Sequence, residues 1–142
     1  MSDLEMRDFL PYLLTMAAET VSVGFQRVYR ERYGMLRTDW RVLFHLGRYG
    51  AMTASEVRAR SRLHKTKVSR AVVNLERLRM VIRETDPKDR RQEVLSLTTS
   101  GQRAYADLSA EAARYDARLW DGVPEAERRA VMSHLRRLAD LA

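Results

Sequence analysis

Residues 65–79 have two chemically distinct faces at helical spacing, and this pattern constrains the fold of the chain most. The hydrophobic face repeats every three or four positions, at Val68, Val72, Leu75 and Leu78. The opposite face is polar and basic, with Lys67, Arg70, Asn74 and Arg77. Such an amphipathic helix packs its hydrophobic face on a core and leaves its polar face in solvent.

The segments around this helix predict a compact unit of short elements. The pair Thr53 and Glu56 is typical of a capping box and predicts a short helix that ends near Arg60. Residues 61–64 then favour a turn before the two-faced helix. Residues 81–85 and 94–98 favour two strands, joined by turn-forming residues that include Asp86 and Pro87. The predicted order is helix, turn, helix and β-hairpin.

The positive charge of the chain is concentrated in this same region. Residues 53–91 hold twelve basic and five acidic residues, so they carry the whole net charge of +7. A localised basic segment is typical of a protein that binds a polyanion. A solvated charged surface is the alternative. A membrane surface is disfavoured, because the hydrophobic residues of the segment fall on faces that we expect to be buried.

A helix of this size fits the major groove of DNA, where the base edges carry a readable pattern of donors and acceptors. We expect its first turns to contact the bases and phosphates through Lys65, Thr66, Lys67, Ser69 and Arg70. Farther along the helix, Asn74 and Arg77 are expected to contact the DNA backbone. The hairpin tip carries Lys88, Arg90 and Arg91, which are placed to enter a neighbouring minor groove.

Helical patterns also flank this central region. They cover residues 4–33, a helix that Thr38 caps and that runs to Arg48, a helix from Thr98 or Thr99 to about 120, and a last helix from Pro124. The first helix and the last two have more hydrophobic surface than a small lobe can cover. A two-fold dimer would bury it. The alternative is that these helices fold back on their own lobe.

The hairpin and the start of the following helix carry a recognisable pattern. The residues Asp89-x-Arg91-x-x-x-Leu95-x-Leu97-Thr98-x-x-Gly101 resemble the wing signature of the MarR family of bacterial transcriptional regulators. Residues 63–81 are similar to the recognition helix of that family. The resemblance implies a homodimer with winged-helix lobes that binds a short near-palindromic operator in double-stranded DNA. It also implies that Asp89 braces Arg91, which inserts into the minor groove.

The resemblance further implies a small aromatic or phenolic effector, bound between the first, second and fifth helices beside the dimer interface. The residues that could line such a crevice are Tyr12, Met16, Trp40, Arg41, Phe44, His45, Arg114 and Tyr115. Arg41 or Arg114 could pair with a carboxylate, and His45 with a hydroxyl. Most of these residues could equally be ordinary core or solvated residues.

Several classes of function are disfavoured by what the sequence lacks. The chain has no cysteine, so disulfides and a thiol-based peroxide switch are excluded. Its three histidines show no metal-ligand spacing, and no phosphate-binding loop or catalytic motif is present, so we expect neither a metal, a cofactor nor an enzyme. The first residues are acidic rather than basic, and no hydrophobic run approaches a membrane span. A cytoplasmic protein is expected.

The sequence therefore predicts a mainly α fold with a small β-wing. We expect a single domain over 1–142, in which residues 38–98 form a winged helix-turn-helix lobe and residues 1–33 and 99–142 form a helical dimerisation region. The predicted function is that of a sequence-specific transcriptional regulator, a repressor that an aromatic or phenolic effector releases from DNA. Two alternatives stay open: a low-specificity architectural or anti-silencing DNA-binding protein without an effector, and a protein-interaction module.

Overall fold

The structure is a computed structural model that describes residues 3–141. The chain forms two compact units, residues 1–110 and residues 111–142. The first unit contains a 3-10 helix at Met6–Asp8, α1 (Leu10–Tyr33), α2 (Arg37–Tyr49), β1 (Met52–Thr53), α3 (Ala54–Ser61), α4 (Lys65–Arg77), β2 (Val81–Thr85), β3 (Glu93–Leu97) and the first half of α5 (Thr99–Leu119). The second unit contains the end of α5 and α6 (Glu125–Leu138).

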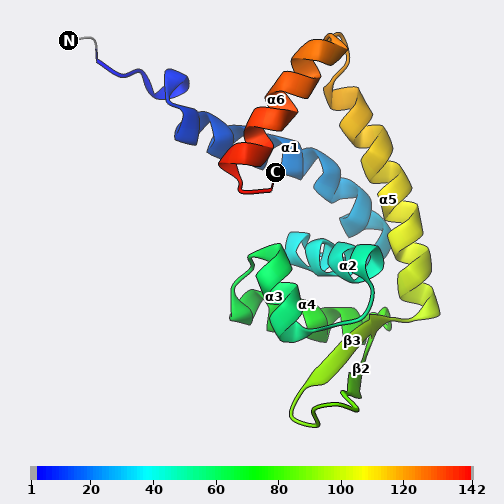
Figure 1. Cartoon of the computed structure of the whole chain (residues 1–142). Helices are drawn as coiled ribbons and strands as arrows, with labels where there is room; N and C mark the ends of the chain where they lie inside the picture. Colours follow the sequence, from blue (N-terminus) through cyan, green and yellow to red (C-terminus); the bar gives the residue numbers. More distant parts are fainter. Residues whose placement is uncertain (1–2, 142) are drawn as a thin grey trace. The chain divides into compact units, whose positions relative to one another are not determined.

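The predicted mainly α fold with a small β-wing is confirmed. Strands β2 and β3 form the hairpin, in which Val81 pairs with Leu97 and Thr85 with Glu93. The short strand β1 pairs with the other edge of β3 and completes an antiparallel sheet of order β1-β3-β2. Figure 1 shows this sheet below α2, α3 and α4, with the β2–β3 hairpin extending away from the helices.

The core of the first unit lies between α2, α3, α4 and β3. The fully buried residues of this core include Val42, Leu43 and Leu46 of α2, Val57 of α3, Val68, Val72 and Leu75 of α4, and Leu95 of β3. Val68, Val72 and Leu75 of the hydrophobic face predicted for α4 are therefore buried, whereas Leu78 is the half-buried C-cap, because α4 ends at Arg77 rather than at residue 79. Burying a side chain of this size contributes about 2 kcal/mol, so this face fixes how α4 is rotated on the core.

The first helix starts later than the sequence pattern predicts. The expected helix covered residues 4–33, whereas α1 begins at Leu10, and Phe9 before it is extended. The physical reason is Pro11, which lies at the start of α1. Proline has no backbone N–H and its ring collides with the carbonyl four residues earlier, so a helix cannot continue through it from residue 7.

The predicted cap of the second helix was also wrong. The N-cap of α2 is Leu36 rather than Thr38, and the Asp39 carboxylate accepts a hydrogen bond from the Leu36 N–H at 2.8 Å. The Thr53 cap is confirmed, since its hydroxyl accepts a hydrogen bond from the Glu56 N–H at 3.2 Å. Both caps satisfy backbone donors that the first helical turn leaves free.

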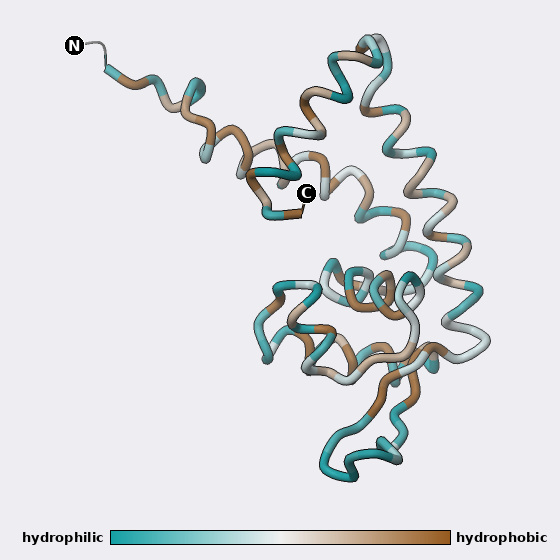
Figure 2. The backbone as a smooth tube through the Cα atoms, viewed as in Figure 1, coloured by the Kyte–Doolittle hydropathy of each residue, from teal (hydrophilic) through white to brown (hydrophobic). Residues whose placement is uncertain are grey.

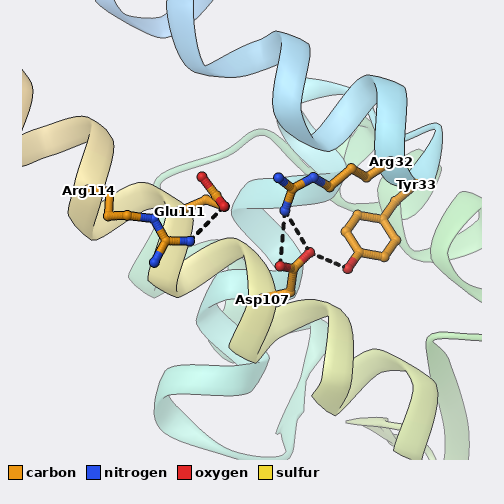
Figure 3. A network of polar contacts seen from close by, with 5 residues as sticks. All are labelled: Arg32, Tyr33, Asp107, Glu111 and Arg114. Atoms are coloured by element: carbon orange, nitrogen blue, oxygen red, sulfur yellow. Dashed lines mark hydrogen bonds and ion pairs between the residues drawn. The ribbon is translucent and has the colours of Figure 1, made fainter.

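The end of α1 is fastened to α5 by Asp107, within the first unit (Figure 3). The Asp107 carboxylate accepts hydrogen bonds from Arg32 at 3.0 Å and from the Tyr33 hydroxyl at 2.6 Å. Partial burial and this hydrogen bond to an anion raise the pKa of Tyr33 to about 12. The contact fixes the C-terminal end of α1, next to Gly34, whose φ of 69° ends the helix.

Hydrophobic side chains are exposed on both units. On and just before the first half of α1 they are Phe9, Leu10, Tyr12, Leu13, Leu14 and Met16. In the second unit they are Leu119, Val131, Leu138 and Leu141. None of the helices within residues 3–141 is long and hydrophobic enough to cross a membrane. A protein surface this hydrophobic is typical of a protein–protein interface.

Candidate nucleic-acid interface

The outer face of α4 carries most of the residues that the sequence pattern assigns to DNA contact. Six of these predicted contacts are exposed on the helix: Lys65, Thr66, Lys67, Ser69, Arg70 and Arg77. They are held in place because Val68, Val72 and Leu75 are buried on the opposite face. A rigid helix with a cationic face can lie against the phosphates of DNA and present side chains to the base edges.

The start of α4 is shaped by the turn before it. Arg62 has a φ of 58°, in the left-handed region, and reverses the chain after α3. His64 is the N-cap of α4, and its Nδ1 atom accepts a hydrogen bond from the Thr66 N–H at 3.2 Å. This turn separates α3 from α4 and places Lys65, Thr66 and Lys67 in the first exposed turn of the helix.

Asn74 differs from the other predicted contacts, because its side chain already has two partners. Its Nδ2 atom donates a hydrogen bond to Asp39 Oδ2 at 2.5 Å, and its Oδ1 atom accepts from Arg77 Nε at 3.2 Å. Asn74 is half-buried. It therefore links α2 to the outer face of α4 and orients the Arg77 guanidinium.

Asp39 is a residue that the sequence reasoning missed. Its side chain is only 1% exposed, and its Oδ2 atom accepts hydrogen bonds from both Leu36 N–H and Asn74. Burial raises the pKa of this carboxyl, and the two hydrogen bonds oppose that shift. The signal in the sequence was an acidic residue at the third position of a helix, beside the hydrophobic residues of α2.

The base of the wing is fastened to α4 by charged residues. Arg83 of β2 contacts Glu76 of α4 at 2.7 Å and Glu93 of β3 at 3.4 Å. The guanidinium of Arg83 therefore pairs with carboxylates of the lobe itself. Through these ion pairs Arg83 links β2 to both α4 and β3.

The tip of the wing is braced by its own side chains. Asp89 Oδ1 accepts hydrogen bonds from the Arg91 N–H at 3.1 Å and from Arg91 Nε at 3.3 Å. Asp86 accepts a hydrogen bond from the Lys88 N–H at 2.9 Å, and both Lys88 and Arg90 are exposed. The Arg91 side chain is 92% exposed, and Figure 2 shows that the hairpin tip is hydrophilic. Asp89 therefore orients an arginine that projects into solvent.

The last part of the wing signature has a structural role. The Thr98 hydroxyl donates a hydrogen bond to the Arg79 carbonyl at 2.7 Å and accepts one from the Gly101 N–H at 3.0 Å. A Cβ atom at Gly101 would collide with the Met80 carbonyl oxygen. Only glycine allows α5 to start this close to the chain that connects α4 to β2.

Four of the residues predicted to line an effector crevice lie on α2: Trp40, Arg41, Phe44 and His45. The rings of Trp40 and Phe44 are 5.5 Å apart, and those of Phe44 and His45 are 6.1 Å apart. The neighbouring Arg41 uses its guanidinium to donate a hydrogen bond to the Ser61 carbonyl at 2.5 Å. Arg41 thus gives a hydrogen-bond donor to the backbone carbonyl of the last residue of α3, a role that the sequence pattern did not predict.

The other predicted effector residues lie on separate elements. Tyr12 and Met16 are exposed on α1. Arg114 and Tyr115 belong to the second unit, in which Arg114 pairs with Glu111 at 2.6 Å (Figure 3) and the Arg118 guanidinium lies 6.0 Å from the Tyr115 ring. Both arginines predicted to meet a carboxylate are therefore bonded within the protein.

The fold and this surface define a winged helix-turn-helix protein. A model described as the MarR family matches residues 33–92, from the end of α1 to the wing tip. The chain is 24% identical to the HTH-type transcriptional regulator YwaE of Bacillus subtilis over 127 residues, which is 89% of this chain and 74% of YwaE. Over residues 33–92, the chain is similar to the MarR family of transcriptional regulators.

Solved structures agree with this fold along almost the whole chain. BpsR of Bordetella bronchiseptica superposes with a TM-score of 0.88 at 22% identity, over 98% of this chain and 99% of BpsR. NadR superposes with a TM-score of 0.77 at 20% identity, over the full length of both chains. At these identities the likeness establishes the fold.

Proposed function

We propose that this protein is a sequence-specific transcriptional repressor that binds a near-palindromic operator in double-stranded DNA. The observation that carries the proposal is the outer face of α4, where Lys65, Lys67 and Arg70 are exposed on a helix whose other face is fixed in the core. The basic residues supply affinity through release of counterions, and the helix supplies sequence preference.

Each predicted contact is assigned a role by its position. Arg70, near the middle of α4, donates a bidentate pair of hydrogen bonds to guanine in the major groove. Thr66 and Ser69 bind phosphates or base edges. At the wing, Arg91 enters the minor groove, and Asp89 orients it by accepting a hydrogen bond from its Nε atom. Arg77 contacts the backbone from its site beside Asn74.

A homodimer accounts for the hydrophobic surface outside the lobe. The exposed side chains on α1 and α6 are too large and too numerous to face water in an isolated monomer. A two-fold dimer buries such surface in a self-complementary interface and presents two copies of α4 to successive major-groove turns, about 34 Å apart. This geometry is what a near-palindromic operator matches.

The ligand of the repressor is proposed to be a small aromatic or phenolic acid. Two structural relatives support this class, since 6-hydroxynicotinic acid regulates the DNA binding of BpsR and NadR was solved in complex with 4-hydroxyphenylacetate. In this chain, the rings of Trp40 and Phe44 supply an aromatic wall. Arg41 and Arg114 bond to the Ser61 carbonyl and to Glu111, and because a guanidinium has five N–H donors, each could bind a carboxylate while keeping this partner.

Two experiments test the proposal: selection of binding sites from a random DNA pool, and footprinting of the DNA beside the gene of this protein. We propose that the repressor acts in the cytoplasm. The expected result is a protected two-fold site. Arg70→Ala should then relax base preference at one position in each half-site, and Arg91→Ala should weaken all sequences evenly. Diffuse protection that random DNA removes would favour the architectural alternative and contradict the proposal.

A further inference from the structure

Val73 is a large hydrophobic residue in the middle of the outer face of α4. Its side chain is 58% exposed, although the residues around it on this face are polar or basic. It lies three positions after Arg70 and four before Arg77, so all three side chains project from one side of the helix. The two-faced sequence pattern of α4 did not single it out.

A shallow hollow surrounds this side chain. It has a volume of about 310 Å³ and is lined by Ser69, Arg70, Val73, Asn74 and Arg77. Asn74 is held by Asp39, and Arg77 is held by Asn74, so one wall of the hollow is fixed to the core. The hollow therefore has a hydrophobic floor between two cationic side chains.

Folding does not explain a valine at this position. A β-branched residue loses side-chain freedom in a helix and lowers helix propensity relative to alanine. Burial would offset this loss, but Val73 is exposed. The neighbouring stripe of Val68, Val72 and Leu75 already supplies the buried face of α4.

We propose that Val73 is a specificity-determining residue that contacts the C5-methyl group of a thymine in the major groove. This rests on the proposed function, in which α4 enters that groove. The thymine methyl is the hydrophobic feature that the major groove presents, and hydrophobic side chains recognise it. Arg70 and Arg77 flank the hollow and hold the DNA against it, so the thymine lies next to the base pair that Arg70 contacts.

The test uses the full chain and an operator selected by it from random DNA. Each thymine is replaced in turn by deoxyuridine, which keeps the hydrogen-bonding edge and removes only the methyl group. At one position per half-site, the substitution should lower the affinity of the wild type about fourfold. This is the change in affinity that corresponds to the burial of one methyl group. Val73→Ala should bind the thymine and uracil operators equally well.

Leu36→Ala is the matched control, because Leu36 is also an exposed hydrophobic residue, 52% exposed, and lies outside α4, the wing and the helices assigned to the dimer interface. It should keep the wild-type preference for thymine. The assignment would be overturned if no deoxyuridine substitution changed the affinity of the wild type. It would also be overturned if Val73→Ala still bound the thymine operator more tightly than the uracil operator. A selection that enriches no sequence at all would instead refute the proposed function, so the two failures are distinguishable.

Discussion

The most informative stability prediction concerns Asn74. Replacing Asn74 by alanine removes the donor that Asp39 Oδ2 accepts at 2.5 Å. It leaves a carboxylate that is 1% exposed, with the Leu36 N–H as its remaining donor among residues 3–141. A hydrogen bond to a buried charged group contributes about 2 kcal/mol. We therefore expect Asn74→Ala to lower the free energy of unfolding by about 2 kcal/mol and Tm by about 6 °C.

A double-mutant cycle with Asp39→Ala isolates this contact. The coupling free energy between positions 39 and 74 should be about 2 kcal/mol, measured by chemical denaturation at a fixed protomer concentration. Asp39→Asn is the matched control, because its amide oxygen can still accept the hydrogen bond from Asn74. A cost below about 0.5 kcal/mol for Asn74→Ala, or strictly additive effects in the cycle, would refute this reasoning.

The same variant has a second effect, on DNA binding. Arg77 loses the Asn74 oxygen that orients its guanidinium, so Asn74→Ala should weaken DNA binding even where the protein is fully folded. Titration of labelled DNA at 15 °C, with circular dichroism to verify that the variant is folded, measures this effect apart from stability. An unchanged affinity would mean that Arg77 does not contact DNA.

Three further predictions concern the wing, the start of α5 and the end of α1. Arg91→Ala should reduce the slope of log affinity against log salt by about one for each wing, measured by DNA titration between 50 and 200 mM salt; an unchanged slope removes Arg91 from the interface. Gly101→Ala should cost about 2 kcal/mol of stability because the new methyl group meets the Met80 carbonyl, whereas Ser100→Ala, at an exposed position, should cost almost nothing. Tyr33→Phe should cost about 1 kcal/mol in thermal melts at pH 8. Because the folded-state pKa of Tyr33 is raised to about 12, the wild type loses this advantage between pH 10 and 12, and a difference that is constant over this range would contradict the assignment.

The local elements of the lobe were predictable because their signals lie close together in the sequence. The period of Val68, Val72 and Leu75 indicates the buried face of α4, and the residues from 81 to 98 favour a hairpin with a turn. The short β1 was not predicted, because two residues form a strand only when they pair with β3. The start of α1 was misplaced because the periodic pattern outweighed the effect of Pro11.

The candidate site was predictable in outline and not in its supporting contacts. Exposed basic residues on α4 follow from periodicity, but the bond between Asp39 and Asn74 joins residues 35 positions apart, which no local pattern encodes. The bond from Arg41 to the Ser61 carbonyl has the same character. Val73 was not predicted, because the basic pattern of α4 indicates contacts to phosphates and polar base edges. The thymine methyl group in the major groove is hydrophobic and is not indicated by charge.

The ratio of specific to random-sequence affinity tests the central claim most directly. It requires dissociation constants of the full chain for a selected operator and for scrambled DNA of equal length, both at about 150 mM salt. If α4 reads bases in the major groove, the operator should be bound at least about 10³-fold more tightly, and Arg70→Ala should reduce that ratio. A ratio near one, unchanged in Arg70→Ala, would contradict sequence-specific recognition by α4.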